Sequence, residues 1–291
     1  MVSLLSNYAS WKILVGIVLL AFLITFLAFK IFRWLFSAEE LEKFNDVTGI
    51  YVNMIGVLYG IFLAFIVIAI WENYNHVKEN INKEADALGN IFRDANALDD
   101  SIKALVDTPA KQYIVAVKSN EWKLQKDGKD TAESQDAIEA RADLQEAILD
   151  ISPNDEGEQV VYDHLISSLN DLTVARRMRV TSTNAELPWI LWALLIGGAL
   201  VLIFYIACFY VPNRNFHMTL AFGVSGLIAV LLFIAISLNY PFVGPDGLSK
   251  TPFDSLSPKN HKAHKEKPKK ETKAKEIKKD HRIKDSLKTA N

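Results

Sequence analysis

Asn53 is the residue with the most unusual surroundings, because its polar amide lies within a long apolar run. Residues 49–71 contain no charged side chain. At about 1.5 Å per residue, such a run makes a helix of roughly 34 Å, enough to cross a hydrocarbon core of about 30 Å. Asn53 shares one expected helix face with Gly56, Gly60 and Ala64. Two interpretations stay open: the small residues allow close packing of a second helix, or the amide faces a water-filled path.

Arg176, Arg177 and Arg179 form a basic cluster shortly before another apolar run, which begins at Pro188 and Trp189. Positive side chains beside a membrane span commonly mark its cytoplasmic end. The same cluster also has the charge to bind an anion or a lipid headgroup. The sequence alone leaves both interpretations open.

The remaining chemistry-bearing residues form no recognisable catalytic or metal-binding pattern. There is no Gly-rich phosphate loop, no His-Glu-x-x-His and no Gly-x-Ser-x-Gly. His76, His164 and His217 are far apart and lack a second ligand at helical spacing. Cys208 is the single cysteine, which excludes an internal disulfide. We therefore expect no enzyme activity, no cofactor and no bound metal.

Four apolar runs must position these residues. Besides residues 49–71, they cover residues 13–29, 188–211 and 216–238. Each is long enough to span a bilayer. The long polar stretch between the second and third runs keeps apolar residues at helical spacing. The sequence therefore predicts an all-α integral membrane protein, with four transmembrane helices and a helical soluble region between spans 2 and 3.

The chain divides where its composition changes. The expected parts are two transmembrane helices, a helical stalk or bundle, a transmembrane hairpin, a post-membrane turn segment and a disordered Lys-rich tail. Their bounds are residues 1–71, 72–187, 188–240, 241–257 and 258–291.

Three local predictions follow from helix start and stop signals. No proline interrupts residues 49–97, so we expect one helix that leaves the bilayer as a stalk, with Gly89 as its weak point. Thr108 and Pro109 predict the start of the next helix. The acidic connection over residues 37–49 is expected to be a loop.

The segment after the fourth span is expected to turn rather than to continue as helix. Pro241, Phe242 and Gly244 belong to a stretch rich in proline and glycine. Proline and glycine commonly end a helix and favour a turn.

Charge is distributed unevenly along a chain whose formal net charge is −2. From Lys250 onward there are 14 Lys and Arg against 6 Asp and Glu. Lys and Arg near the ends of the spans are more frequent on the side that holds both termini and residues 72–187, and such an excess indicates the cytoplasmic side. We expect a multi-pass protein of the inner (plasma) membrane, with these parts in the cytoplasm. The tail is expected to contact anionic lipid, or only to solubilise, and to bind no specific nucleic acid.

The chain resembles the bestrophin-like family of bacterial membrane proteins over residues 10–255. The resemblance rests on four segments: GVLYGIFLAFIVIAIWENY at 56–74, KEADALGNIFRDA at 83–95, LPWILWALLIGGA at 187–199 with Arg176 and Arg179 ahead of it, and PFVG at 241–244. More distantly it is similar to bestrophins, which are pentameric anion channels. Trp71, Asn73 and Tyr74, and Asn239 followed by Pro241 and Phe242, carry that similarity.

The resemblance to bestrophins implies a homo-oligomer whose second spans surround a pore for an inorganic ion. Asn53, Val57, Ile61 and Ala64 would line this pore, and rings of Val57 and Ile61 would make a hydrophobic constriction. The acidic run that forms a calcium clasp in bestrophins is missing here, so calcium gating is not expected. The alternative function is a membrane-anchored helical interaction or sensor module that does not conduct.

Overall fold

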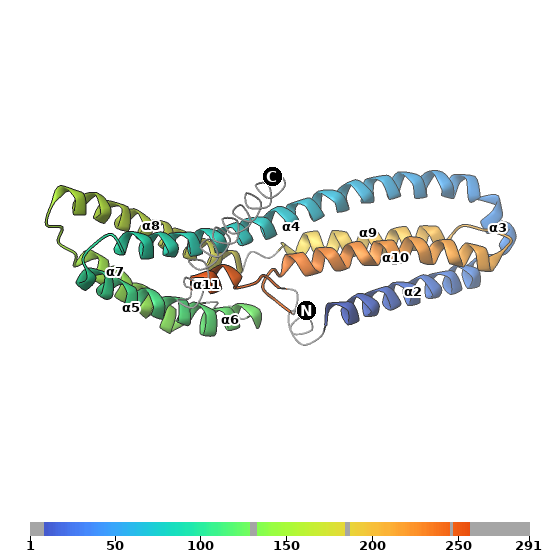
Figure 1. Ribbon diagram of the computed structural model, residues 1–291. Coiled ribbons are helices and arrows are strands. Elements are labelled where there is room, and N and C mark those ends of the chain that lie inside the picture. Colours follow the sequence, from blue (N-terminus) through green and yellow to red (C-terminus); the bar gives the residue numbers. More distant parts are fainter. Residues whose placement is uncertain (1–8, 129–132, 184–186, 245–246, 257–291) are drawn as a thin grey trace, which may run out of the picture. The chain divides into compact units, whose positions relative to one another are not determined.

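The computed structural model describes residues 9–128, 133–183, 187–244 and 247–256, and these residues form helices without any strand. Four helices are long and apolar enough to cross a membrane: α2 (Ser10–Leu35), α4 (Asn45–Ala95), α9 (Trp189–Ala207) and α10 (Arg214–Asn239). The predicted all-α fold with four spans is confirmed (Figure 1). The Lys-rich tail, residues 258–291, lies outside the described residues.

The chain forms two compact units. The membrane unit consists of Met1–Ile81, Asn120–Ser134 and Val174–Leu248. The helical unit consists of Asn82–Ser119, Gln135–Thr173 and Ser249–Asn291. Within residues 72–187, Asn120–Ser134 and the stretches at both ends, residues 72–81 and 174–187, group with the membrane helices. Ion pairs between Glu121 and the end of α8 (Glu156–Thr183) explain this grouping.

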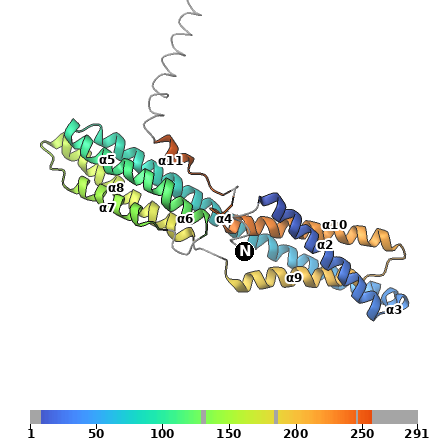
Figure 2. The same ribbon diagram turned by 90° about the horizontal axis from the view of Figure 1, so that it is seen from below.

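In the membrane unit, α2, α9 and α10 run alongside one another and beside the first half of α4 (Figures 1 and 2). Their apolar side chains form two clusters. One joins α4 to α9 and α10, and it includes Tyr59, Leu63, Leu195 and Ile228. The other joins α2 to α9 and α10. Burial of such side chains holds helices together where their sequences are apolar on all sides.

The connection between the first two spans contains a short helix, α3 (Ala38–Lys43), so the predicted loop is wrong. A capping box starts it: the Ser37 hydroxyl accepts from the Glu40 backbone, and the Glu40 carboxylate accepts from the Ser37 backbone. The Ser37 hydroxyl also donates to the Glu40 carboxylate at 2.9 Å. The two bonds that this carboxylate accepts lower the pKa of Glu40, and the bond from the Ser37 backbone is the larger cause. Because protonation would break them, α3 loses this cap only as the pH falls below the usual carboxylate range.

The single stalk helix is confirmed, since α4 begins at Asn45 and ends at Ala95. The side-chain amide of Asn45 fixes its start, by donating to the Tyr210 carbonyl at 2.7 Å and accepting from the Tyr210 backbone N–H at 2.9 Å. Gly89 does not interrupt the helix. A Cβ at this position would lie 3.4 Å from Leu256, the residue after α11 (Thr251–Ser255), which is an ordinary van der Waals contact.

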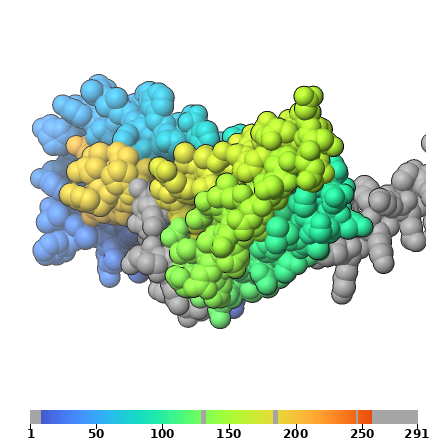
Figure 3. Space-filling model, turned by 90° about the vertical axis from the view of Figure 1, so that its left-hand side faces the viewer, coloured from blue at the N-terminus to red at the C-terminus, as the bar shows by residue number. Residues whose placement is uncertain are grey.

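The helical unit contains α5 (Asp100–Ala116), α7 (Gln135–Leu149) and most of α8, beside the C-terminal end of α4, residues 82–95. Figure 3 shows the lime side chains of α7 and α8 lying directly against the blue-green side chains of α4 and α5. On α8, Leu165, Leu169 and Leu172 are buried, because residues three and four positions apart share one face of a helix.

The predicted helix start at Thr108 and Pro109 is wrong, because α5 begins at Asp100 and continues through both residues. The hydroxyl of Thr108 bonds to the Ala104 carbonyl within the helix, at 3.2 Å, instead of capping it. Pro109 is buried. Its apolar ring contributes to the core, and this burial offsets the backbone hydrogen bond that proline cannot make.

A buried hydrogen bond fixes α4 to α5 inside the helical unit. The Tyr113 hydroxyl donates to the Glu84 carboxylate at 2.6 Å, and both side chains are fully buried. We expect Tyr113→Phe to lower the free energy of unfolding by about 1–3 kcal/mol, because the buried carboxylate loses a donor. Chemical unfolding in detergent, followed by circular dichroism, measures this. The control is Tyr162→Phe on α8, which makes the same substitution at a half-buried tyrosine. Equal losses in the two variants would contradict the prediction.

Candidate functional site

The buried face of α4 fixes the orientation of this helix in the membrane unit. Tyr59, Leu63, Ile66 and Ile70 pack against α9 and α10 and are at most 7% exposed. The Tyr59 hydroxyl donates to the Leu195 carbonyl at 3.2 Å. The opposite face of α4 is therefore turned away from the other helices of its own chain.

Four residues of the predicted pore lining lie on this outward face: Asn53, Val57, Ile61 and Ala64, here called the α4 stripe. All four are exposed in the single chain. Within the described part of the chain, the Asn53 amide has no hydrogen-bond partner, and an amide in hydrocarbon needs one. Water or another copy of the chain would supply it. The stripe is thus the part of α4 that the single chain leaves incomplete.

A second exposed row on α4 consists of Met54, Leu58 and Phe65, which are 61%, 58% and 69% exposed. These residues follow Asn53, Val57 and Ala64 by one position each, so they lie about 100° further around the helix. The row is large and apolar, whereas the α4 stripe contains an amide and an alanine. The exposed surface of α4 therefore offers two chemically different sides.

The glycines expected in helix packing differ in their surroundings. A Cβ on Gly56 would lie 3.8 Å from Leu202 of α9, whereas one on Gly60 would meet nothing within 4 Å. A much closer approach between two spans occurs at Gly198 of α9, where a Cβ would lie 2.6 Å from the Tyr59 ring. This contact was not predicted. The Gly197-Gly198 pair inside a span indicates close packing, but Tyr59, which Gly198 contacts, is 139 positions away in the sequence.

Two of the three clustered arginines are buried and share one carboxylate. Arg176 donates to one carboxylate oxygen of Glu121 at 2.5 Å, and Arg179 donates to the other oxygen of Glu121 at 2.7 Å. The side chains of Glu121 and Arg179 are fully buried, and that of Arg176 is 7% exposed. Glu133 adds a longer pair with Arg176, at 3.4 Å. We call Arg176 and Arg179 the buried arginine pair, and Glu121 supplies the carboxylate that both bind. Arg177 is exposed, so it is the member of the cluster that a lipid headgroup can reach.

Glu121 was not singled out in the sequence. It ends a π-helical segment, Val117–Glu121, between α5 and α6 (Trp122–Lys126). Such π-helical turns are uncommon and occur frequently at functional sites.

The turn after the fourth span packs on the same network. Gly244 adopts a positive φ of 88°, and the Leu248 N–H donates to the Pro241 carbonyl at 2.7 Å. Phe242 is buried and meets the Trp122 ring edge-to-face at 5.5 Å. The guanidinium of Arg179 lies 6.0 Å from the centre of the same indole ring. Trp122 thus connects the turn to the buried arginine pair.

The described residues contain no group of His, Cys, Asp and Glu that could hold a metal ion. His217, one of the histidines considered above, is buried and packs edge-to-face on Phe29 at 4.6 Å. Phe29 belongs to α2, so this histidine contributes to packing between α2 and α10.

Comparison with known proteins agrees with this architecture. Residues 15–253 match the model of the Bestrophin-like domain. A crystal structure of a bacterial Bestrophin homolog from Klebsiella pneumoniae, a single-residue variant, matches with a TM-score of 0.61 and 12% identity, over 84% of this chain and 95% of that one. A crystal structure described as a membrane protein matches with a TM-score of 0.61 and 14% identity, over 82% and 93%. At such identity the likeness shows the fold.

A search of curated proteins finds no match. The family model covers more than half of the chain, including all four apolar helices from residue 15 onward. The chain belongs to the Bestrophin-like family.

Proposed function

We propose that this chain forms a homo-oligomeric ion channel, a pentamer that conducts anions, with the α4 stripe of each copy facing a central pore. The observation that carries the proposal is the exposed stripe itself. Its opposite face is buried against the chain's own helices, and Asn53 lacks a partner within the described residues. A ring of copies gives Asn53 water and gives the large apolar row of Met54, Leu58 and Phe65 a neighbouring helix or lipid.

The chemistry of the stripe favours a neutral pore with a hydrophobic constriction. Rings of Val57 and Ile61 would narrow the path and control its wetting. Asn53 would offer amide donors, and no carboxylate lies on the stripe to repel an anion. The fold of the bacterial Bestrophin homolog supports the assignment at the level of architecture. In this proposal the protein lies in the inner membrane with residues 72–187 and both termini in the cytoplasm, because Lys and Arg near the spans are more frequent on that side.

Current through planar bilayers tests the channel. Reconstituted protein is expected to conduct, and Ile61→Ala or Val57→Ala to increase conductance severalfold, because the constriction widens and wets more easily. Leu58→Ala removes a similar volume from the large apolar row and is the matched control. Asn53→Asp is expected to move the reversal potential in a salt gradient toward cation selectivity.

The proposal fails if verified oligomer carries no current under varied ions and voltages. It also fails if Leu58→Ala changes conductance as much as Ile61→Ala does. A monomer in mild detergent would instead favour the non-conducting interaction module.

A further inference from the structure

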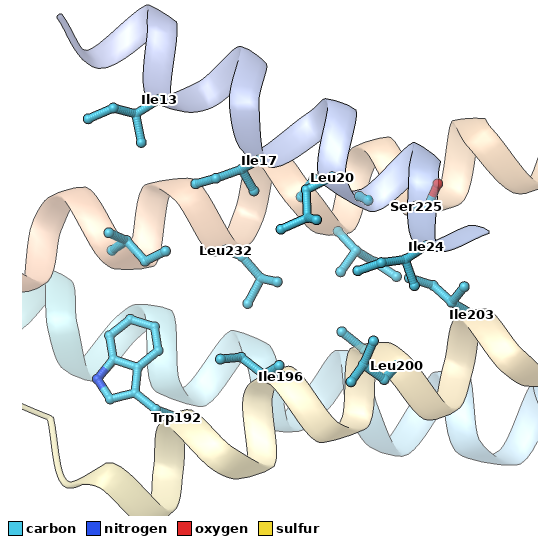
Figure 4. A pocket seen from close by; sticks show the side chains of 15 residues that line it. Ile13, Ile17, Leu20, Ile24, Trp192, Ile196, Leu200, Ile203, Ser225 and Leu232 are labelled. Carbon is cyan, nitrogen blue, oxygen red and sulfur yellow. The ribbon is translucent and has the colours of Figure 1, made fainter. Parts of the chain in front are cut away.

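The membrane unit contains an apolar cavity of about 300 Å³ between α2, α9 and α10 (Figure 4). Ile17 and Leu20 of α2 face Ile196 of α9 and Leu232 of α10 across it. The one hydroxyl in its wall, Ser225, is already satisfied, because it donates to the Phe222 carbonyl at 3.3 Å. The side chains of the lining, Trp192 included, expose no polar surface to the cavity, so it offers no hydrogen bond to water. An apolar cavity of this kind stays dry in the absence of an apolar occupant.

The cavity has the depth of one membrane leaflet. Its lining covers residues 13–24 of α2, 192–203 of α9 and 225–236 of α10. The two end residues of each stretch are eleven positions apart, which corresponds to about 16 Å of helix. One leaflet contributes about 15 Å to a hydrocarbon core of about 30 Å. A single acyl chain of that leaflet has the matching length.

One end of the cavity lies at a membrane surface. Ile13, Trp192 and Ile236 are each three residues from a helix end, since α2 begins at Ser10, α9 begins at Trp189 and α10 ends at Asn239. Figure 4 shows the Trp192 ring near this end of the cavity. Indole rings favour the interface between hydrocarbon and headgroups. Lys12, exposed beside Ile13, carries the charge that pairs with a lipid phosphate.

We propose that this cavity binds one acyl chain of a phospholipid, whose headgroup lies at the end marked by Trp192 and Lys12. The acyl chain enters from the surrounding leaflet and contacts three of the four spans. It fills a space that would otherwise leave the facing side chains without contact partners. The site is separate from the α4 stripe and does not depend on conduction.

Lipid retention measured by native mass spectrometry tests the site. The purified oligomer is washed extensively with delipidating detergent, and bound phospholipid is counted for each subunit. Wild-type protein is expected to retain one phospholipid in each subunit. Ala21→Phe, which places a ring in the cavity, is expected to lose it. Ala193→Phe makes the same change at an exposed position of α9 outside the lining and is expected to retain it.

A second measurement needs no cavity-filling variant. Delipidated protein receives a stoichiometric amount of phospholipid brominated on its acyl chains, and tryptophan fluorescence is recorded. Quenching is expected in the wild type and largely absent in Trp192→Phe. The proposal is overturned if folded wild-type protein retains no phospholipid, if Ala21→Phe folds and retains as much as the wild type, or if quenching is the same with and without Trp192.

Discussion

Glu121→Gln is expected to lower the free energy of unfolding by about 3–5 kcal/mol, because it leaves two buried guanidinium groups without the carboxylate that both bind. Glutamine has nearly the same shape, so the loss reports charge rather than packing. Arg179 is fully buried and cannot move its charge to water without opening the contact between α8 and Trp122. Thermal unfolding of the detergent-solubilised protein, followed by circular dichroism, measures the change.

Glu133→Gln is the matched control for this prediction. Glu133 also pairs with Arg176, but at 3.4 Å and with 48% of its side chain exposed. A long ion pair with one partner half exposed contributes less than about 1 kcal/mol. A Glu121→Gln protein that unfolds at the same temperature as Glu133→Gln would show that the buried ion pairs contribute little to holding Asn120–Ser134 on the membrane unit.

Gly198→Val is expected to destabilise the membrane unit by about 3 kcal/mol, the upper part of the range for overpacking a core. A Cβ at this position would lie 2.6 Å from the Tyr59 ring. Moving the ring away would cost free energy, because it is buried and its hydroxyl donates to the Leu195 carbonyl. The valine is therefore expected to push α9 away from α4. Since the buried face of α4 sets the direction of the α4 stripe, we also expect channel current to fall.

The neighbouring glycine provides the control. Gly197→Val introduces the same side chain at a position where a Cβ would meet nothing within 4 Å. It is expected to leave the unfolding temperature and the current close to those of the wild type. Similar losses at both positions would mean that valine acts on the helix itself rather than on the contact with Tyr59.

The proposed channel and the proposed lipid site use different surfaces of the four spans. In the proposed channel the α4 stripe faces other copies of the chain, whereas the cavity lies between α2, α9 and α10. Gly198 and Tyr59 stand between these two features, because they join α9 to the buried face of α4. A variant that changes lipid retention without changing current would show that the two sites act independently.

The sequence alone predicted the elements that depend on local properties. Length and apolar content identified four spans, and helical spacing identified the unbroken helix that became α4, since both signals lie within the segment itself. Local signals failed at Pro109 and in the acidic connection. At Pro109 burial outweighs a local preference for helix starts, and the connection contains a capping box at Ser37 and Glu40 that was not recognised.

Tertiary structure decided what each face contacts. Helical spacing placed Asn53, Val57 and Ile61 on one face of α4, but only the packing of Tyr59 against α9 showed which face is turned outward. The same holds for the arginines. Glu121 lies 55 and 58 positions before Arg176 and Arg179, so nothing in their own segment shows that they are buried and paired. Side-chain type and spacing determine what a helix can bury, whereas its partners are set by contacts between segments far apart in the chain.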